Sequence, residues 1–166
     1  MIYNYSLKSI NMQVFVPYKE PLKCAETLWS DQKRYNKQII ECRQIIDAID
    51  GKLAWKNHPV TLMYKPYREW LSYYMECLIS YRHFNKATDG SNGELIWKHE
   101  TLYNNEEANK ITPPFLTEEF CDNHKRRLYT KDNKLYPQFK EYGITEENWY
   151  FVDNELRIYK NGKRIK

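Results

Sequence analysis

The amino-acid sequence predicts a mainly α fold that ends in a β-hairpin, and three observations support this prediction. Apolar residues recur at helical spacing over most of residues 21–50 and, more strongly, over 67–81. Helix-start signals precede residues 118–131. Near the end of the chain, Asn161–Gly162 lies between two short alternating runs, which is a strong hairpin signal.

The first residues leave several interpretations open. Residues 1–11 show no clear period, so they are a short N-terminal arm, a strand, or an extension before a second possible start at Met12. The short apolar run QVFVP follows at 13–17. Pro21 then takes the position that proline favours at the start of a helix, so we expect the first helix to begin there.

The next stretch is expected to contain two helices. The helical pattern runs from Pro21 through Asp50, with a break near Ser30, and Gly51 ends it. The tripeptide NHP at 57–59 marks the next boundary.

The strongest amphipathic pattern follows this boundary. Its apolar positions are Tyr67, Trp70, Leu71, Tyr74, Leu78 and Tyr81. We interpret them as one face of a core helix, with a base-stacking platform as the alternative. Trp149 and Tyr150 fall outside this stripe, which leaves stacking open for them.

The second half begins with an irregular excursion over residues 85–114, which contains DGSNG and a Pro-Pro pair. Thr117 resembles an N-cap followed by two acidic residues, and it should open a helix that ends near Lys131. The run ELRIYKNGKRIK then predicts the terminal hairpin.

The length of 166 residues suits one domain. We divide the chain into an N-terminal extension (1–11), a single helical domain (12–150) and a C-terminal hairpin appended to it (151–166).

Composition indicates a folded protein with an uneven charge distribution. Aromatic residues make up 16% of the chain, which a disordered chain would not carry. The net charge is +4, with Lys and Arg gathered in 33–37, 125–131 and 157–166 and acids in 94–119 and 141–155. This asymmetry suggests a basic surface offered to a polyanion, or else a scattered solubilising surface.

The four cysteines are widely spaced and include no CxxC pair. We therefore expect reduced, buried thiols in a cytosolic compartment rather than a metal site. No membrane-spanning run or signal peptide is visible, so no membrane association is expected.

Glu41 lies where a charged stretch gives way to residues that favour burial. A turn of about 100° per residue places Arg34, Lys37, Gln38 and Glu41 in one polar stripe of a helix. One interpretation is an exposed i, i+4 ion pair with Lys37, worth roughly 0.2–0.5 kcal/mol. The other is a functional carboxylate at the edge of the core.

Three segments together resemble a known family. They are DQKRYNKQIIE (31–41), WKNHPVTLMYKPYREWLSYYMECLISY (55–81) and NHKRRLYTKDNKLYPQF (123–139). In this order they resemble the pyrimidine-dimer DNA glycosylases of the phage endonuclease V type, most closely a bacterial and viral branch that opens with a stretch like VFVPY, here Val14 to Tyr18. The resemblance covers roughly Met12 to Tyr150.

The resemblance implies a compact three-helix bundle with long loops that acts on double-stranded DNA as a monomer, without a cofactor or metal, in the cytoplasm of a bacterial or infected cell. Family members cut the glycosidic bond of a damaged pyrimidine and then cleave the abasic strand. An N-terminal α-amine forms an imine with the sugar, and an indispensable glutamate matches Glu41.

The nucleophilic amine is where this sequence departs from the family. Neither Met1–Ile2 nor Met12–Gln13 offers the small second residue that removal of an initiator Met usually needs. A start at Met12 would return the amine to the family's position. Lys33 or Lys37 would substitute if desolvated, but both are also suited to phosphate contacts.

The candidate DNA-binding residues are Arg34, Lys37, Gln38, Asn57, His58, His124, Arg126, Arg127 and Lys131. The basic members would neutralise phosphates, and the alternative for each is a solvated helix face. For His58, a helix cap or a satisfied buried histidine is as well supported as a phosphate contact, and the same alternatives apply to His124.

Three functions remain compatible with the sequence. The first is a DNA glycosylase, with or without AP-lyase activity, acting on a damaged or modified pyrimidine in duplex DNA. The second is a catalytically silent DNA-binding module on the same scaffold, and the third is a viral protein-interaction protein. Glu41 favours the first function, and the displaced amine favours the second.

Overall fold

The computed structural model describes residues 12–86 and 112–166. The predictions for residues 1–11, and for 87–111 of the irregular excursion, lie outside the described residues. The helices are α1 (Pro21–Leu28), α2 (Gln32–Ile49), α3 (Pro59–Tyr64), α4 (Arg68–Lys86) and α7 (Glu118–Lys131), with 3-10 helices η1 (Lys65–Tyr67) and η2 (Pro137–Tyr142). The strands are β1 (Glu147–Val152), β2 (Glu155–Lys160) and β3 (Lys163–Arg164). The predicted mainly α fold is confirmed.

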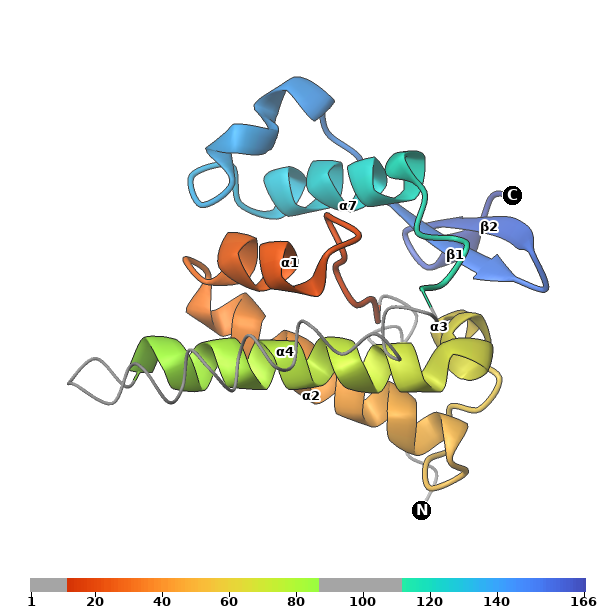
Figure 1. Ribbon diagram of the computed structural model, residues 1–166. Coiled ribbons are helices and arrows are strands. Elements are labelled where there is room, and N and C mark those ends of the chain that lie inside the picture. The colour runs from red at the N-terminus through yellow and green to blue at the C-terminus, as the bar shows by residue number, and fades with distance from the viewer. Residues whose placement is uncertain (1–11, 87–111) are drawn as a thin grey trace, which may run out of the picture.

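The three long helices α2, α4 and α7 define the architecture (Figure 1). Helix α4 packs against both α2 and α1. Helix α7 runs above α1 in Figure 1 and is continued by η2, which folds back on it. Helix α3 joins the helical layers to the sheet through its contacts with α2 and β1.

The helix ends follow the local signals in the sequence. Pro21 occupies the first position of α1. Asp31 caps α2 by accepting a hydrogen bond of 3.1 Å from the backbone N of Arg34. Thr117 caps α7 in the same way, since its Oγ1 accepts from the backbone N of Phe120 at 3.2 Å. The predicted break near Ser30 and the predicted start of α7 are therefore confirmed.

The C-terminal sheet has three antiparallel strands in the order β1-β2-β3. The predicted turn at Asn161–Gly162 joins β2 to β3, and both residues have positive φ values (50° and 75°), as a tight hairpin turn requires. Strand β1 was not predicted. Its inward-facing positions include Asn148, so a polar residue interrupts the apolar alternation by which strands are detected.

Aromatic residues fill the core. Trp70, Leu71, Tyr74 and Leu78 of α4 are buried, which confirms the predicted core face of this helix. The Trp70 ring stacks on Tyr74 with centroids 5.5 Å apart and an interplanar angle of 13°. Burial on this scale favours the core interpretation over a base-stacking platform.

All four cysteines lie within the described ranges, and each is a buried free thiol. Burial raises the pKa of the Cys24 and Cys42 thiols, which keeps them protonated. None of the described helices is long and apolar enough to cross a membrane. Within the same residues, no three His, Cys, Asp or Glu side chains converge as metal ligands would.

Candidate active site

A cavity of about 590 Å³ opens beside Glu41. Its walls come from the extended segment before α1, from α2 and from the C-terminal end of α7. The lining residues are Met12, Gln13, Phe15, Arg34, Lys37, Ile40, Glu41, Gln44 and Lys131. We call this space the Glu41 cavity. It collects residues from distant parts of the chain, including several that the sequence predicts as site residues.

Glu41 itself is buried, with 7% of its surface exposed. Burial raises the pKa of its carboxyl group, although the charges of Lys37, Arg34 and Lys131 act in the opposite direction. The predicted i, i+4 contact exists, with Lys37 Nζ 3.7 Å from Oε1 of Glu41. The predicted exposed ion pair is therefore only half right: the Lys37 side chain is exposed, but the Glu41 carboxylate is buried.

Gln38 fixes the orientation of Glu41. Its Nε2 donates to Oε2 of Glu41 at 3.0 Å and to the backbone O of Gln13 at 3.3 Å. Its Oε1 accepts a hydrogen bond of 2.7 Å from the backbone N of Phe15. Gln38 is fully buried, so we assign it to positioning the site rather than to contact with DNA.

The segment at residues 12–16 is held at its backbone by several elements. Besides Gln38 of α2, three side chains from α4, α7 and β1 bind it. These hydrogen bonds join Tyr74 Oη to Phe15 O (2.6 Å), Tyr150 Oη to Met12 O (2.8 Å) and Val16 N to His124 Nδ1 (2.7 Å). The position of residue 12 at the cavity is therefore defined by the whole fold.

His124 is fully buried and serves this anchoring function. In addition to the bond from Val16, its Nε2 lies 2.8 Å from the Gln13 side-chain amide. Burial, assisted by the charge of Arg127, lowers the pKa of His124 to about 3. The ring is therefore neutral at physiological pH, and its burial removes it from the surface where DNA contact was expected.

Two arginines approach the ring of Phe15. The guanidinium carbons of Arg34 and Arg127 lie 5.2 and 5.8 Å from its centroid. Arg127 is only 7% exposed, and no described residue provides a hydrogen-bond partner for its Nε or Nη1. Burial lowers the pKa of this guanidinium group. A buried arginine with free donors is well suited to an anionic ligand such as a phosphate.

Arg127 also lines a second cavity of about 300 Å³. The other lining residues are Thr130, Lys131, Thr145, Glu146, Asn148 and Asn161. Lys131 lines both cavities, so both border the C-terminal end of α7. Lys131 is exposed by surface area, but desolvation of its amine and the charges of Arg34, Arg127 and Lys37 lower its pKa to about 8.

The remaining predicted residues lie away from the Glu41 cavity. Lys33 and Asn57 are exposed and line none of these cavities. His58 is the N-cap of α3, where its Nδ1 accepts from the backbone N of Val60 at 3.1 Å. Arg126 donates from Nε to the backbone O of Tyr142 at 3.0 Å. Tyr150 is fully buried, which argues against base stacking.

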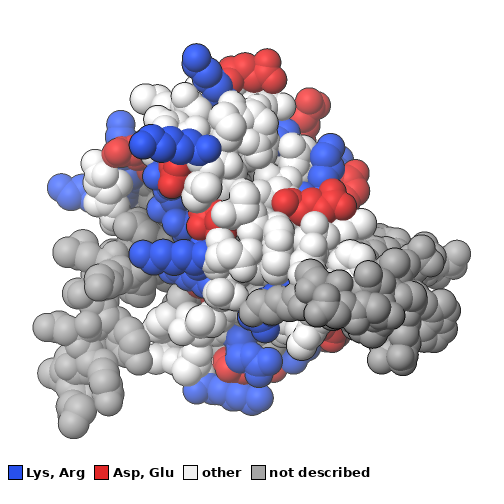
Figure 2. Space-filling model, turned by 90° about the vertical axis from the view of Figure 1, so that its left-hand side faces the viewer, with Lys and Arg blue, Asp and Glu red and all other residues white. Residues whose placement is uncertain are grey.

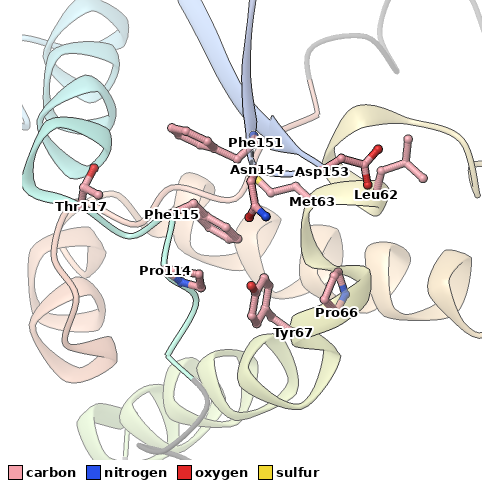
Figure 3. A pocket seen from close by; sticks show the side chains of 10 residues that line it. All are labelled: Leu62, Met63, Pro66, Tyr67, Pro114, Phe115, Thr117, Phe151, Asp153 and Asn154. Atoms are coloured by element: carbon pink, nitrogen blue, oxygen red, sulfur yellow. Dashed lines mark hydrogen bonds between the residues drawn. The ribbon is translucent and has the colours of Figure 1, made fainter.

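A third cavity of about 370 Å³ lies beside the sheet (Figure 3). The rings of Tyr67, Phe115 and Phe151 line it, and Asn154 of the β1–β2 turn reaches toward it. It lacks the convergent charged side chains of the Glu41 cavity. We therefore take the Glu41 cavity as the candidate active site.

Charges of both signs are present on the face shown in Figure 2, where Lys and Arg side chains gather toward one side with acidic side chains among them. Such a mixed surface does not by itself distinguish a DNA-binding face from a scattered solubilising surface. The grouping of Arg34, Arg127 and Lys131 around two adjoining cavities is more specific.

Comparison with known protein families gives a match that includes this site. The family model described as pyrimidine dimer DNA glycosylase matches residues 12–81. The match supports the family resemblance over these residues. Searches of the curated proteins and of the solved structures find no match.

The matched region begins at Met12 and contains Glu41 with the other α2 residues of the cavity. The motif at 123–139 lies beyond it, and the bacterial and viral branch remains a prediction. Gln13, Phe15 and Gln44 were not among the predicted site residues. Gln44 could have been predicted, because it lies three residues after Glu41 and therefore on the same face of the helix.

Proposed function

We propose that the protein is a DNA glycosylase that releases a damaged or modified pyrimidine from duplex DNA and then cleaves the abasic strand as an AP lyase. The observation that carries the proposal is a buried carboxylate, Glu41, with a raised pKa at a cavity lined by Arg34, Lys37 and Lys131. The family match over residues 12–81 supports the same reaction class.

The carboxylate suits both steps of this chemistry. As the bond between sugar and base breaks, positive charge grows on the sugar, and a fixed carboxylate stabilises it most effectively in a site that excludes water. A raised pKa also suits proton transfer, which the later elimination needs at C2′. The hydrogen bond from Gln38 holds the carboxylate in one orientation for these tasks.

The cavity has a volume appropriate to an extruded nucleotide. Small-molecule sites range over about 300–1,000 Å³, and the Glu41 cavity, at about 590 Å³, falls within this range. An enzyme that acts on a base must take the nucleotide out of the stack, which costs less where damage has weakened pairing. The cations around the cavity are suited to hold the flanking phosphates.

The test is a pair of assays on duplexes that carry a defined pyrimidine lesion, beginning with a cyclobutane thymine dimer, beside an undamaged duplex. Base release is measured as alkali-labile sites, and lyase activity as direct strand cleavage. The wild type should give both products, and Glu41→Gln should lose most of both. Glu76→Gln, on an exposed position of α4, is the matched control and should retain activity.

A second candidate function is DNA binding without catalysis. It is favoured by one observation: neither Met1–Ile2 nor Met12–Gln13 offers the small second residue that removal of an initiator Met usually needs. Tight binding to duplex DNA with no base release from any damaged substrate would establish this alternative.

The setting that we propose is the cytoplasm of a bacterial or infected cell, with the protein acting as a monomer. The four buried free thiols support a reducing compartment. Light scattering of the purified protein, with and without a short duplex, tests whether it is a monomer.

A further inference from the structure

Ile40 is a feature of the Glu41 cavity that the proposed reaction does not use. It lines the cavity beside Glu41, the next residue of α2, yet 56% of its surface is exposed. Phe15 and Met12, which also line the cavity, are only 2% and 6% exposed. Ile40 therefore lies at the opening of the cavity, whereas the other two apolar side chains lie deeper in the protein.

Packing within the fold does not explain an isoleucine at this position. The buried face of α2 includes Ile39, Cys42 and Ile46, and a turn of about 100° per residue carries Ile40 away from that face. The branched side chain also makes isoleucine a weaker helix former than alanine or leucine. An isoleucine exposed here therefore contributes little to the stability of the protein by itself.

Single exposed apolar residues are common on protein surfaces, so the position of such a residue decides whether it is informative. Five large apolar side chains are exposed within residues 12–86 and 112–166: Ile40, Leu53, Leu135, Ile144 and Ile165. Among these five, Ile40 alone lines one of the three cavities described above. Its exposure thus coincides with the candidate active site, and the other four provide controls of the same kind.

The polar neighbours of Ile40 suit a nucleic acid. Lys37 precedes Ile40 by three residues and Gln44 follows it by four, so the three side chains adjoin on one stripe of α2, and all three line the cavity. The Lys37 side chain is 60% exposed, which leaves its ammonium group accessible to a phosphate. Proteins that insert an apolar side chain between base pairs place Lys, Arg, Asn or Gln beside it to hold the groove.

We propose that Ile40 is a wedge that enters the base stack of duplex DNA while a nucleotide is extruded into the Glu41 cavity. The inference rests on the proposed function, because it requires that this cavity receives a nucleotide. Extrusion leaves a gap in the stack, and return of the nucleotide closes it. The Ile40 side chain, at the opening of the receiving cavity, fills this gap and removes its own apolar surface from water.

The wedge acts on extrusion and not on bond cleavage. No covalent bond changes at Ile40, and its insertion shifts the equilibrium between the stacked and the extruded nucleotide toward the extruded form. Its contribution should therefore be greatest where the lesion is well stacked and paired, and smallest where the duplex is already open at that position. A residue that only maintained the fold would affect every duplex alike.

Base release from a duplex with a cyclobutane thymine dimer, measured in single turnover at saturating protein, gives the first test. Ile40→Ala removes three carbon atoms from the wedge and should slow release by about tenfold or more. Ile40→Leu keeps the apolar bulk and should stay within a few-fold of the wild type. Ile165→Ala is the matched control, because Ile165 is 57% exposed and lines none of the three cavities, and it should release the base at the wild-type rate.

Two further measurements separate a wedge from a structural residue. With the same dimer opposite two bases that cannot pair with it, Ile40→Ala should recover most of the wild-type rate. In urea, Ile40→Ala should unfold at the wild-type midpoint or slightly above it, since alanine is the better helix former. A clear fall in this midpoint, or equal slowing on both duplexes, would assign Ile40 to the structure and overturn the wedge.

A fluorescence assay reports the wedge without catalysis. The base analogue 2-aminopurine, placed beside a tetrahydrofuran abasic-site analogue in a duplex, becomes brighter when its stacking is lost. Binding of the wild type should raise this fluorescence. At saturating protein, Ile40→Ala should lose most of the rise, and Ile165→Ala should keep it.

The outcomes distinguish this inference from the proposed function. If the wild type releases the damaged base and Ile40→Ala matches it in release rate and in fluorescence, the wedge is overturned and the glycosylase stands. If no damaged duplex loses a base, the proposed function fails, and the fluorescence assay alone decides the wedge. Loss of the rise in Ile40→Ala would then support insertion by a protein that only binds DNA, and a retained rise would overturn it.

Discussion

Gln38 Nε2 donates a hydrogen bond of 3.0 Å to Oε2 of Glu41, and the two residues lie one turn apart on α2. The other end of the same amide accepts the backbone N–H of Phe15. The orientation of the carboxylate is therefore coupled to the segment that carries residue 12 into the cavity.

Replacing Gln38 by Leu should reduce both stability and activity. The change leaves the buried N–H of Phe15 without its acceptor, which costs about 1–3 kcal/mol in the free energy of unfolding. It also frees the Glu41 carboxylate, so kcat should fall more than KM rises. Urea unfolding and steady-state cleavage assays measure the two effects. Gln138→Leu, at an exposed position of η2, should change neither; an unaltered kcat in Gln38→Leu would remove Gln38 from the site.

Replacing Glu41 by Gln should stabilise the protein at neutral pH while it abolishes most activity. Because burial raises the pKa of Glu41 above its unfolded value, the folded state favours the protonated form. The stability that this proton provides is present at low pH and is lost as pH rises through the folded pKa. The variant should therefore exceed the wild type in free energy of unfolding at pH 7, by a difference that shrinks toward pH 4.

Urea denaturation of both proteins at pH 7 and pH 4 measures this difference. A wild type that is the more stable protein at pH 7 would show that the contact with Lys37 outweighs the cost of burial. The expected gain in stability of Glu41→Gln has a general reason: a functional site that keeps a charge partly out of water lowers the stability of the fold, and removing that charge restores it.

His124 should make the fold sensitive to acid. Its pKa is lowered to about 3 in the folded protein, against an ordinary value near 6.5, so the unfolded state binds the proton more readily. The stability from the neutral ring is fully present above pH 6.5 and is lost as pH falls toward 3. Over this range its contribution to the slope approaches about 1.4 kcal/mol per pH unit.

Denaturation midpoints between pH 7 and pH 4 test this prediction. His124→Gln should be less stable at pH 7 and should show a flatter dependence on pH. His83→Gln, on the exposed surface of α4, should keep the wild-type slope. Equal slopes in all three proteins would assign the acid sensitivity to other groups.

Binding to undamaged duplex should weaken steeply with salt, and Arg126 and Arg127 should contribute to that dependence. The free donors of Arg127 suit a phosphate, and Arg126 retains its terminal nitrogens beyond the bond from Nε to Tyr142. The double replacement by Gln should flatten the slope of log K against log salt by roughly one unit per lost contact. Arg43→Gln, on the exposed side of α2, is the control, and an unchanged slope in the double variant would assign the pair to structure.

The sequence predicted the elements whose signals are local. The cap at Thr117, the break near Ser30 and the turn at Asn161–Gly162 each depend on a few adjacent residues, and each is present in the structure. Strand β1 escaped detection because its apolar alternation contains Asn148, which faces inward. A strand of that kind is recognised only once its partner strand and α3 are in place.

The candidate site was predictable only in part. Spacing placed Glu41 at the edge of the core, but the resemblance to a family was needed to favour a functional carboxylate. The anchoring roles of Gln38 and His124 depend on contacts with residues 12–16, more than twenty positions away in sequence. The lowered pKa of Lys131 requires the approach of α2 to α7, which no local pattern reports.

The start of the chain provides the last prediction. Met12 is 6% exposed and lines the Glu41 cavity, where Tyr150 holds its carbonyl oxygen. A form that begins at Met12 would replace the peptide nitrogen of that residue by an α-amine at the same place. Such an amine has a pKa of about 7.7–8.0, so much of it is neutral at pH 7 to 8.

Deleting residues 1–11 should therefore preserve or raise lyase activity. In the shortened chain, acetylation of the new α-amine should abolish borohydride trapping of an abasic-site duplex. The reason is positional, since an amine misplaced by 1 Å loses about a hundredfold in rate. If only the full-length chain traps the sugar, through Met1, residues 1–11 contribute to the site. If the shortened chain traps nothing, the fixed position of residue 12 does not bring its amine within reach of C1′.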